Sequence, residues 1–300
     1  MTQEPASKLR ILFATDGSGP ARRIARLLRQ LVLPVTERLT ILSVAPQSFL
    51  SGARPDPSFL LKVTPAARKR ALIESQELAE EAATELDPGV SVEAVSRWGN
   101  PIEEILRTAR RLPAGLVVLG AKGHSDLGLM LLGSVSQGVV LQSSVPVLIA
   151  RPREDPVARV LIGYDDSPEA RKAIEFLDRF RLPLDVEIIL SYVDTPLPKA
   201  QRSSRRSALA AAEVAIERRQ DAGEKALGLV AARLAGQGYR VTTEVLEGAA
   251  APELDSSARR HGAALIIVGS RKPAPARHYL LGSTAEKLVR HAQASVLVVR

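Results

Sequence analysis

A glycine-rich stretch near the middle of the chain has residue types and a spacing suited to binding an anion. In residues 118–136, VLGAKGHSDLGLMLLGSVS, an apolar run ends at Gly120. Two residues separate Gly120 from Gly123, and nine residues separate Gly123 from the pair Gly133-Ser134. Gly120 lets the chain leave a strand with little steric restriction, and Gly123 permits a positive φ or close ligand approach. Gly133-Ser134 opens a predicted helix, whose free N–H groups and positive dipole end favour a phosphate. The stretch predicts a phosphate site covered by a flap.

A carboxylate, Asp16, ends the first apolar run of the chain and is a second candidate for chemistry. In a doubly wound sheet of order 3-2-1-4-5 the first and fourth strands are neighbours, and ligands bind where the strand order reverses. Asp16 and Gly120 are then expected to face each other across one crevice. A helix cap is the alternative role for Asp16 and for its later counterpart Asp165, and both roles are compatible.

Other phosphate-binding and metal-binding patterns do not fit this chain. It has no G-x-x-x-x-G-K-[ST] motif, and Arg22 stands where a dinucleotide fingerprint after the first strand needs its third glycine. The four histidines lack metal-ligand spacing with carboxylates, so we expect no metal site in the protein itself.

The chain contains the same domain twice. ILFATDGSGPARRIARLL (residues 11–28) is matched by VLIGYDDSPEARKAIEFL (residues 160–177), with a constant offset of 149 residues that also relates the later glycines. We therefore expect two domains, residues 1–152 with the complete glycine motif and residues 153–300 with a degenerate one.

Each copy alternates short apolar runs with longer amphipathic segments. The runs are β-branched and nearly continuous, which is typical of strands covered on both faces. Alternation with helices predicts an α/β domain with a doubly wound, five-stranded parallel sheet. In the first copy the predicted strands are residues 10–15, 38–44, 90–95, 115–120 and 145–150, and the predicted helices are 19–31, 65–86, 100–111 and 133–144.

A strand-terminal Asp followed by G-x-x-G-x9-G-[ST] and then PVLIAR resembles the universal stress protein family, and the resemblance covers both copies. It implies two adenine nucleotide hydrolase-like domains paired through their last strands as a pseudo-dimer, and it implies ATP, with Mg²⁺ as a companion ion, as the ligand. Carried over position by position, the ATP-binding residues are Ala14, Thr15, Asp16, Val44, Leu119, Gly120, Lys122, Gly123, Gly133, Ser134, Val135 and Ser136.

The second copy departs from this motif, because Lys272 stands at the position of Gly123 and two prolines follow it. A residue with a Cβ opposes a positive φ, and proline removes donors. We therefore predict that this copy binds ATP weakly or not at all. Its weaker site comprises Asp165, Gly269, Gly282 and Ser283. A different anion on Arg271, Lys272, Arg277 and His278, or a plain basic surface loop, are the alternatives.

Composition restricts the remaining function classes. The net charge is +8, but most arginines alternate with glutamates at helical spacing and without aromatic residues, which disfavours a nucleic-acid surface. The chain has no cysteine, which fits a reducing cytoplasm, and its first residues lack a signal-peptide pattern. The long uncharged stretch of residues 127–150 is broken by polar residues and Pro146, so we expect no membrane span.

Two functional hypotheses follow. The first is an ATP-binding stress-response or signalling module, in which ATP orders the flap and an unidentified protein partner senses the change. The second is a nucleotide-independent interaction scaffold. The crevice lacks a positioned base and nucleophile, so we expect no enzyme activity beyond slow ATP hydrolysis. Pairing of the two copies leaves assembly with further copies of the chain open.

Overall fold

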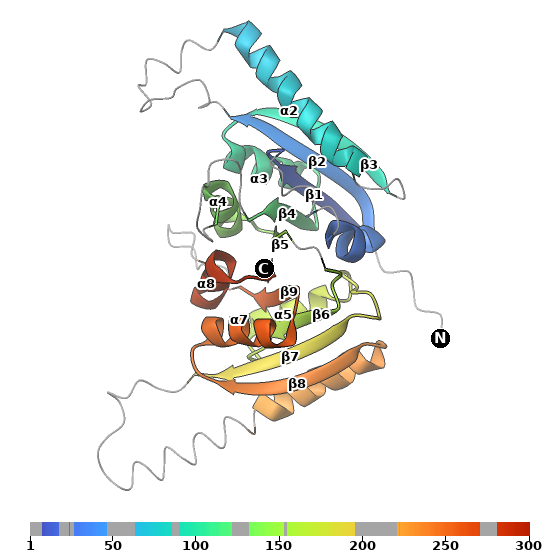
Figure 1. Cartoon of the computed structure of the whole chain (residues 1–300), viewed down its shortest axis with the longest axis vertical. Helices are drawn as coiled ribbons and strands as arrows, with labels where there is room; N and C mark the ends of the chain where they lie inside the picture. Colours follow the sequence, from blue (N-terminus) through green and yellow to red (C-terminus); the bar gives the residue numbers. More distant parts are fainter. Residues whose placement is uncertain are drawn as a thin grey trace, which may run out of the picture. The chain divides into compact units, whose positions relative to one another are not determined.

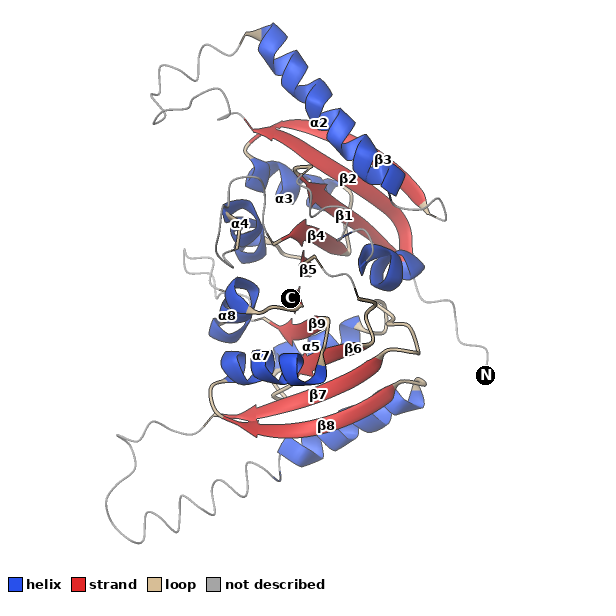
Figure 2. Cartoon of the chain, viewed as in Figure 1, coloured by secondary structure: helices blue, strands red, loops and turns tan. Residues whose placement is uncertain are grey.

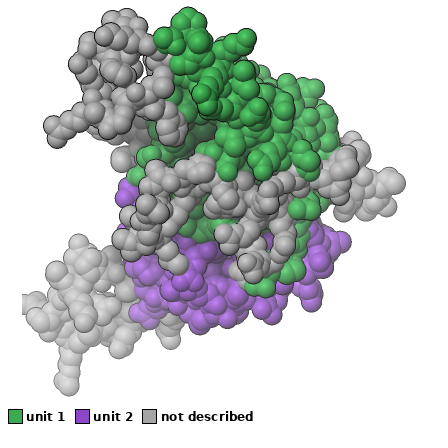
Figure 3. Space-filling view, turned by 45° about the horizontal axis from the view of Figure 1, so that its top comes forward, with its two compact units in different colours: residues 1–156, 179–181 green, residues 157–178, 182–300 purple. Residues whose placement is uncertain are grey.

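The computed structural model of the chain (Figure 1) describes residues 8–17, 24, 27–46, 64–85, 90–121, 132–152, 155–195, 221, 223–270 and 281–300. Its strands and helices (Figure 2) fall into two compact units (Figure 3). The first unit is Met1–Pro156 with Arg179–Arg181, and the second is Val157–Asp178 with Leu182–Arg300.

The first unit is a five-stranded parallel sheet in the order β3-β2-β1-β4-β5, as the sequence predicts. Helix α2 packs on β2 and β3, whereas α3 packs on β1, β2 and β3 and against α4. Figure 2 shows the red strands between α2 and the pair α3 and α4. The elements are β1 Leu9–Thr15, a π-helical turn Leu28–Val32, a 3-10 turn Leu33–Val35, β2 Thr36–Pro46, α2 Pro65–Glu85, β3 Ser91–Gly99, α3 Pro101–Arg111, β4 Leu116–Gly120, α4 Ser134–Gln142 and β5 Val147–Ala150.

The core of the first unit is built from continuous apolar strands. Residues 116–119 of β4 and 147–150 of β5 are all buried, as expected for strands covered on both faces. Helix α3 begins as its sequence predicts: the Asn100 side chain accepts hydrogen bonds from the amides of Ile102 (3.0 Å) and Glu103 (3.3 Å), and Pro101 occupies the first helical position.

Strands β2 and β3 are longer than the sequence patterns predict. Residues 38–44 and 90–95 were expected, but the paired strands continue to Pro46 and Gly99. The extra residues of β3 are half-buried or, at Arg97, exposed, so the end of an apolar run does not mark the end of the strand. Gly99 then turns the chain at φ +151°, a backbone conformation that side-chain-bearing residues rarely adopt.

The second unit repeats the same topology, with strand order β8-β7-β6-β9-β10 and parallel pairing throughout. Helix α7 packs on β6, β7 and β9 and against α8, as α3 does with its sheet and α4. The elements are β6 Arg159–Gly163, α5 Pro168–Phe176, β7 Glu187–Asp194, a helix over residues 223–236, β8 Arg240–Glu247, α7 Ala250–His261, β9 Leu265–Gly269, α8 Ser283–His291 and β10 Ser295–Val299.

None of the helices in the described parts of the chain combines the length and the apolar character that crossing a bilayer requires. Pairing of the last strands of the two copies stays a prediction. The predicted helix of residues 19–31 and the predicted flap between Gly123 and Gly133 lie mainly outside the described residues.

Gly269, the last residue of β9, has no room for a side chain. A Cβ atom at this position would overlap the backbone of Glu169 and meet that of Ala170, in the first turn of α5. The helix therefore packs directly on the end of the strand, and backbone atoms cannot move aside as a flexible side chain can.

We expect Gly269→Ala to lower the unfolding free energy by about 1–3 kcal/mol, because it overpacks this contact. Thermal or urea unfolding followed by circular dichroism measures the change. The matched control is Gly228→Ala in the helix of residues 223–236, where a Cβ would meet nothing within 4 Å. That control should be neutral or stabilise by about 0.5–1 kcal/mol, and equal behaviour of both variants would contradict the packing assignment.

Candidate functional site

The carboxyl edge of the first sheet brings the predicted site residues together. Strands β1 and β4 are parallel neighbours with Ala14 opposite Leu119, so Thr15 is level with Gly120. The chain continues from β1 toward β2 and from β4 toward β5, which makes the gap between β1 and β4 the point where strand order reverses. Asp16 and Gly120 therefore lie at the same edge, on adjacent strands.

The first turn of α4 is fixed against the end of β4 by two hydrogen bonds. The Gly133 amide donates to the Ala121 carbonyl (2.8 Å), and the Ser136 hydroxyl donates to the Gly120 carbonyl (2.7 Å). These bonds hold the start of the helix at the same edge as Asp16, even though the residues between Ala121 and Leu132 are outside the described parts of the chain.

The amino end of α4 is open to an anion. Gln137 makes the first intrahelical bond, to the Gly133 carbonyl at 2.9 Å, so the amides of Ser134, Val135 and Ser136 precede the helical ladder. No side chain caps them, and the first turn has no acidic residue. Three N–H groups and the positive end of the helix dipole thus meet at one point.

The two serines of this turn differ in what they offer. Ser134 is exposed, so its hydroxyl is accessible from solvent. Ser136 is 7% exposed and its hydroxyl is committed to the Gly120 carbonyl. Ser136 therefore positions the helix through its side chain and can serve a ligand only through its amide.

Strand β2 forms the neighbouring wall of the edge. Ser43 is opposite Thr15, so Val44 is level with Asp16. The predicted position of Val44 at the end of the second strand is wrong by two residues, because β2 runs to Pro46. Its extension pairs Ala45 with Trp98 of β3, at the same carboxyl edge of the sheet but two strands away from β1. Sequence analysis missed this residue; the half-buried alternation of VSVEAVSRWG is the signal that could have revealed it.

Two residues of the predicted site, Lys122 and Gly123, lie outside the described residues. The same holds for the basic group Arg271, Lys272, Arg277 and His278 of the second copy. Their predicted roles stay predictions.

In the second unit the equivalent edge begins with a carboxylate that is already hydrogen-bonded. Asp165, the counterpart of Asp16, accepts from the Ser167 amide (3.1 Å) and from the Ser167 hydroxyl (2.5 Å). Ser167 in turn accepts from the Ala170 amide (3.2 Å) and caps α5. Asp165 therefore supports the start of a helix.

Asp166 adds a second occupied group at this edge. It stands at the position of Gly17, and both residues have a positive φ, +57° and +72°. Its carboxylate accepts from the Tyr164 hydroxyl (2.8 Å) and, at both oxygens, from Arg171 (3.0 and 2.9 Å). The hydrogen bond from Arg171 lowers the pKa of Asp166, whereas burial and the bond to Asp166 raise the pKa of Tyr164.

The amino end of α8 also differs from that of α4. Gly282 precedes it without a side-chain cap, and Ser283 is exposed, as in the first unit. However, Ala285 stands at the position of Ser136 and provides no hydroxyl, and Glu286 brings a carboxylate into the first turn. A carboxylate there competes with an incoming phosphate for the positive end of the helix.

A half-buried polar cluster lies between α7 and strands β7 and β8, away from this edge. Glu244 accepts hydrogen bonds from the hydroxyls of Ser191 (2.6 Å) and Ser257, and lies 3.3 Å from His261 Nε2. Arg260 is 3.7 Å away. Burial raises the pKa of Glu244, but the hydrogen bonds from Ser191, Ser257 and His261 together outweigh burial and lower it.

Comparison with known proteins gives one consistent result. The family model of the universal stress protein family matches residues 9–151 and again residues 156–300. Universal stress protein YxiE of Bacillus subtilis is 33% identical over 148 residues, which are 47% of this chain and 98% of that protein. Universal stress protein Rv1996 of Mycobacterium tuberculosis is 32% identical over 199 residues, 62% of this chain and 58% of that protein.

A solved structure covers nearly the whole chain. A universal stress protein from Archaeoglobus fulgidus is similar with a TM-score of 0.63 and 22% sequence identity, over 97% of this chain and 96% of that one. At this identity the likeness concerns the fold of both repeats.

The lowered pKa of Glu244 gives a pH prediction. The carboxylate stabilises the folded state at pH values above its unfolded pKa, and this contribution is lost as the pH falls through the lower folded pKa. We expect Glu244→Gln to lower the free energy of unfolding by about 1–3 kcal/mol at pH 7. The unaltered protein should lose stability as the pH falls below about 4.3, and the variant should lose less. Urea unfolding at pH 7 and pH 3, with Glu247→Gln on the same strand as the control, measures both effects. An unchanged pH profile would contradict the assignment.

Proposed function

This chain belongs to the universal stress protein family, and we propose that it is an ATP-binding member whose first repeat holds the nucleotide as a signal. One observation carries the proposal: the uncapped first turn of α4 is fixed at the strand edge that also carries Asp16. Its three leading amides form a site for the negatively charged phosphates.

The other end of the nucleotide is assigned to β1 and β2. Thr15 and Asp16 at the end of β1 suit hydroxyl groups of a ribose, and Val44, level with Asp16, offers backbone groups to the adenine. Beside them β2 and β3 continue past the end of β1, so the base has a wall to lie against. Ligands of doubly wound sheets bind in this place, at the carboxyl ends of the strands.

The second repeat is proposed to hold no ATP. Three features oppose binding there: the α5 turn packed on Gly269, the carboxylate of Glu286 in the first turn of α8, and the side chains around Asp166. Two of them, Asp166 and Glu286, are carboxylates at positions where the first repeat has Gly17 and Gln137. The weaker second site on Asp165, Gly269, Gly282 and Ser283 is therefore given a structural role.

The proposed mode of action is binding with a conformational readout. Within the described residues of the first-repeat edge, no base is positioned beside a nucleophile, so slow hydrolysis is the most that we assign. ATP, with Mg²⁺ on its phosphates, orders the loop before α4, and a protein partner distinguishes the loaded form from the empty one. Such a module acts in the cytoplasm, where ATP is available.

An interaction scaffold is the second candidate, and the second repeat favours it. Its edge is closed by its own side chains, so that repeat keeps the fold without an open nucleotide site. In that case the protein acts by binding partner proteins, and nucleotide binding is not required.

We expect one ATP per chain. Nucleotide extracted from the purified protein, and titration calorimetry with Mg-ATP, measure the stoichiometry. Saturating ATP should also raise the melting temperature by mass action. Two nucleotides per chain would contradict the assignment to one repeat, and absence of both nucleotide and thermal shift would favour the scaffold.

Ser134→Pro tests the phosphate position. Proline is tolerated at the first helical position, and Gly133 already has the extended backbone that precedes proline, yet the substitution removes one amide donor. We expect ATP affinity to fall about 10-fold or more, as for loss of a hydrogen bond to a charged group.

The matched control is Ser283→Pro at the start of α8, which should leave ATP affinity unchanged. Calorimetry and the fluorescence of Trp98, the single tryptophan of the chain, measure binding. Equal melting temperatures establish that both variants fold. Unchanged ATP affinity in Ser134→Pro would contradict the assignment of the ATP phosphates to the first turn of α4.

A further inference from the structure

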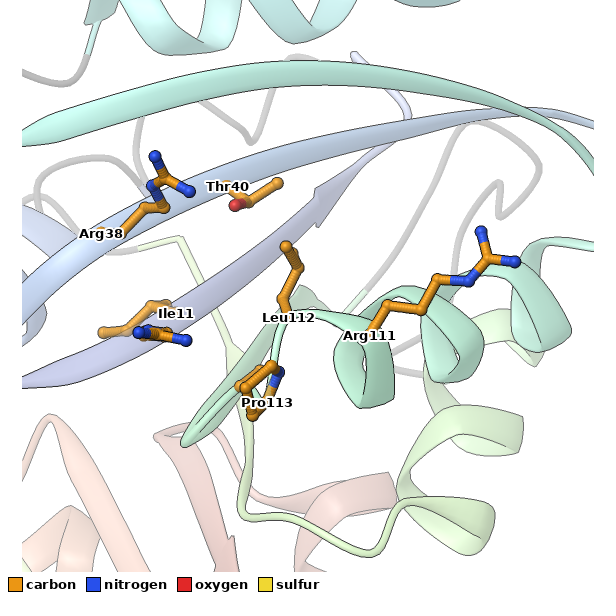
Figure 4. Close-up of a pocket in the computed structure, with 8 residues that line it drawn as sticks. Ile11, Arg38, Thr40, Arg111, Leu112 and Pro113 are labelled. Carbon is orange, nitrogen blue, oxygen red and sulfur yellow. The ribbon is translucent and has the colours of Figure 1, made fainter.

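A cavity of about 210 Å³ lies in the first unit, at the edge of the sheet opposite to the proposed ATP site. It opens between the first residues of β1 and β2 and the carboxyl end of α3 (Figure 4). Its polar lining comprises Arg10, Arg38, Thr40 and Arg111, and Leu112 and Pro113 form the apolar wall.

Two arginines of this cavity stand directly opposite each other. Arg10 and Arg38 are register partners on the parallel strands β1 and β2, so their side chains leave the same face of the sheet. Like charges in this arrangement repel. Each forms a loose, solvent-exposed ion pair, with Arg10 Nε 3.7 Å from Glu37 and Arg38 Nη1 4.0 Å from Glu93. Both contacts exceed hydrogen-bond length, so the guanidinium donors keep capacity for an acceptor.

Thr40 adds a hydroxyl group to the lining of the same cavity. The residue as a whole is 2% exposed, and its hydroxyl can donate a hydrogen bond to an anion in the cavity. In Figure 4 Thr40 lies across from Leu112, with Arg38 beside it on β2, whereas Arg111 extends away from them.

The second repeat has different residues at the positions of Arg38 and Thr40. At the position of Arg38 it has Glu187, which pairs with Arg159 at 2.9 Å; Arg159 also donates to the His261 carbonyl at 3.0 Å. At the position of Thr40 it has the buried, apolar Ile189. The second repeat thus has a hydrogen-bonded ion pair where the first repeat has two facing arginines in looser ion pairs, and an apolar side chain where the first repeat has the Thr40 hydroxyl.

We propose that the cavity of the first repeat binds a phosphate group, with Arg10 and Arg38 pairing with its oxygens and the Thr40 hydroxyl donating a hydrogen bond to it. Guanidinium groups bind phosphate by charge-assisted hydrogen bonds. The negative end of α3, about half an elementary charge, is smaller than the two full charges of the arginines, and Arg110 and Arg111 in its last turn offset it. The volume suits inorganic phosphate or the terminal phosphate of a small phosphomonoester and is below that of nucleotide pockets.

The test uses the full chain, titrated with inorganic phosphate at constant ionic strength and followed by amide and arginine NMR signals. We expect saturable shifts at Arg10, Arg38 and Thr40. Arg38→Glu, which gives the first repeat the ion pair of the second, should weaken binding about 10-fold or more. Thr40→Val should weaken it without a charge change, and Arg68→Gln in α2, an exposed arginine outside the lining of the cavity, should leave it unchanged.

A parallel titration with glycerol 3-phosphate distinguishes the two sources of the group: tighter binding assigns the site to a phosphomonoester, equal or weaker binding to free phosphate. Melting temperatures establish that each variant folds, and Arg38→Glu should be at least as stable as the unaltered chain. Non-saturable shifts, or an equal loss of affinity in Arg68→Gln and Arg38→Glu, would overturn the proposal, because either result means general attraction to positive charge. ATP binding is measured separately, with the Ser134→Pro variant. Failure of the phosphate proposal can therefore be distinguished from failure of the ATP proposal.

Discussion

The candidate site depends on the opposite directions in which the chain leaves β1 and β4. Both strands end at one edge in a fixed register, Ala14 beside Leu119, but one continues toward β2 and the other toward β5. Ligands of doubly wound sheets bind at such a gap. The hydrogen bond from Ser136 to the Gly120 carbonyl then fixes the positive end of α4 at this gap. Topology and one side-chain bond therefore produce the site before any residue contacts a ligand.

The two repeats show that the backbone of this edge and its chemistry are separable. Gly17 and Asp166 occupy equivalent positions and both adopt a positive φ. Glycine adds no side chain at this point, whereas the Asp166 carboxylate accepts hydrogen bonds from Tyr164 and Arg171. Because an aspartate tolerates this conformation, the second repeat carries a hydrogen-bonded carboxylate here on an equivalent backbone position.

The sequence predicts the duplication, the strand order and the cap of α3, because each depends on local patterns that are separated by a constant offset. The lengths of β2 and β3 were not predictable in the same way, since half-buried residues remain in a strand only while a partner continues beside them. The cluster around Glu244 was also missed. It joins Ser191 and Ser257, which become neighbours only when β7 and β8 pair and α7 packs on them.

Charge distinguishes the repeats more consistently than shape does. At three positions the second repeat has an acid where the first has a neutral or basic residue, and each acid pairs with an arginine of its own unit: Asp166 with Arg171, Glu187 with Arg159 and Glu286 with Arg290. The first repeat has Gly17, Arg38 and Gln137 there and retains arginines at positions 10 and 22. A carboxylate within the fold and a phosphate from solution satisfy the same donors. The second repeat thus has acidic side chains at positions where the first repeat is neutral or basic, and this difference is the reason for proposing phosphate-bearing ligands for the first repeat.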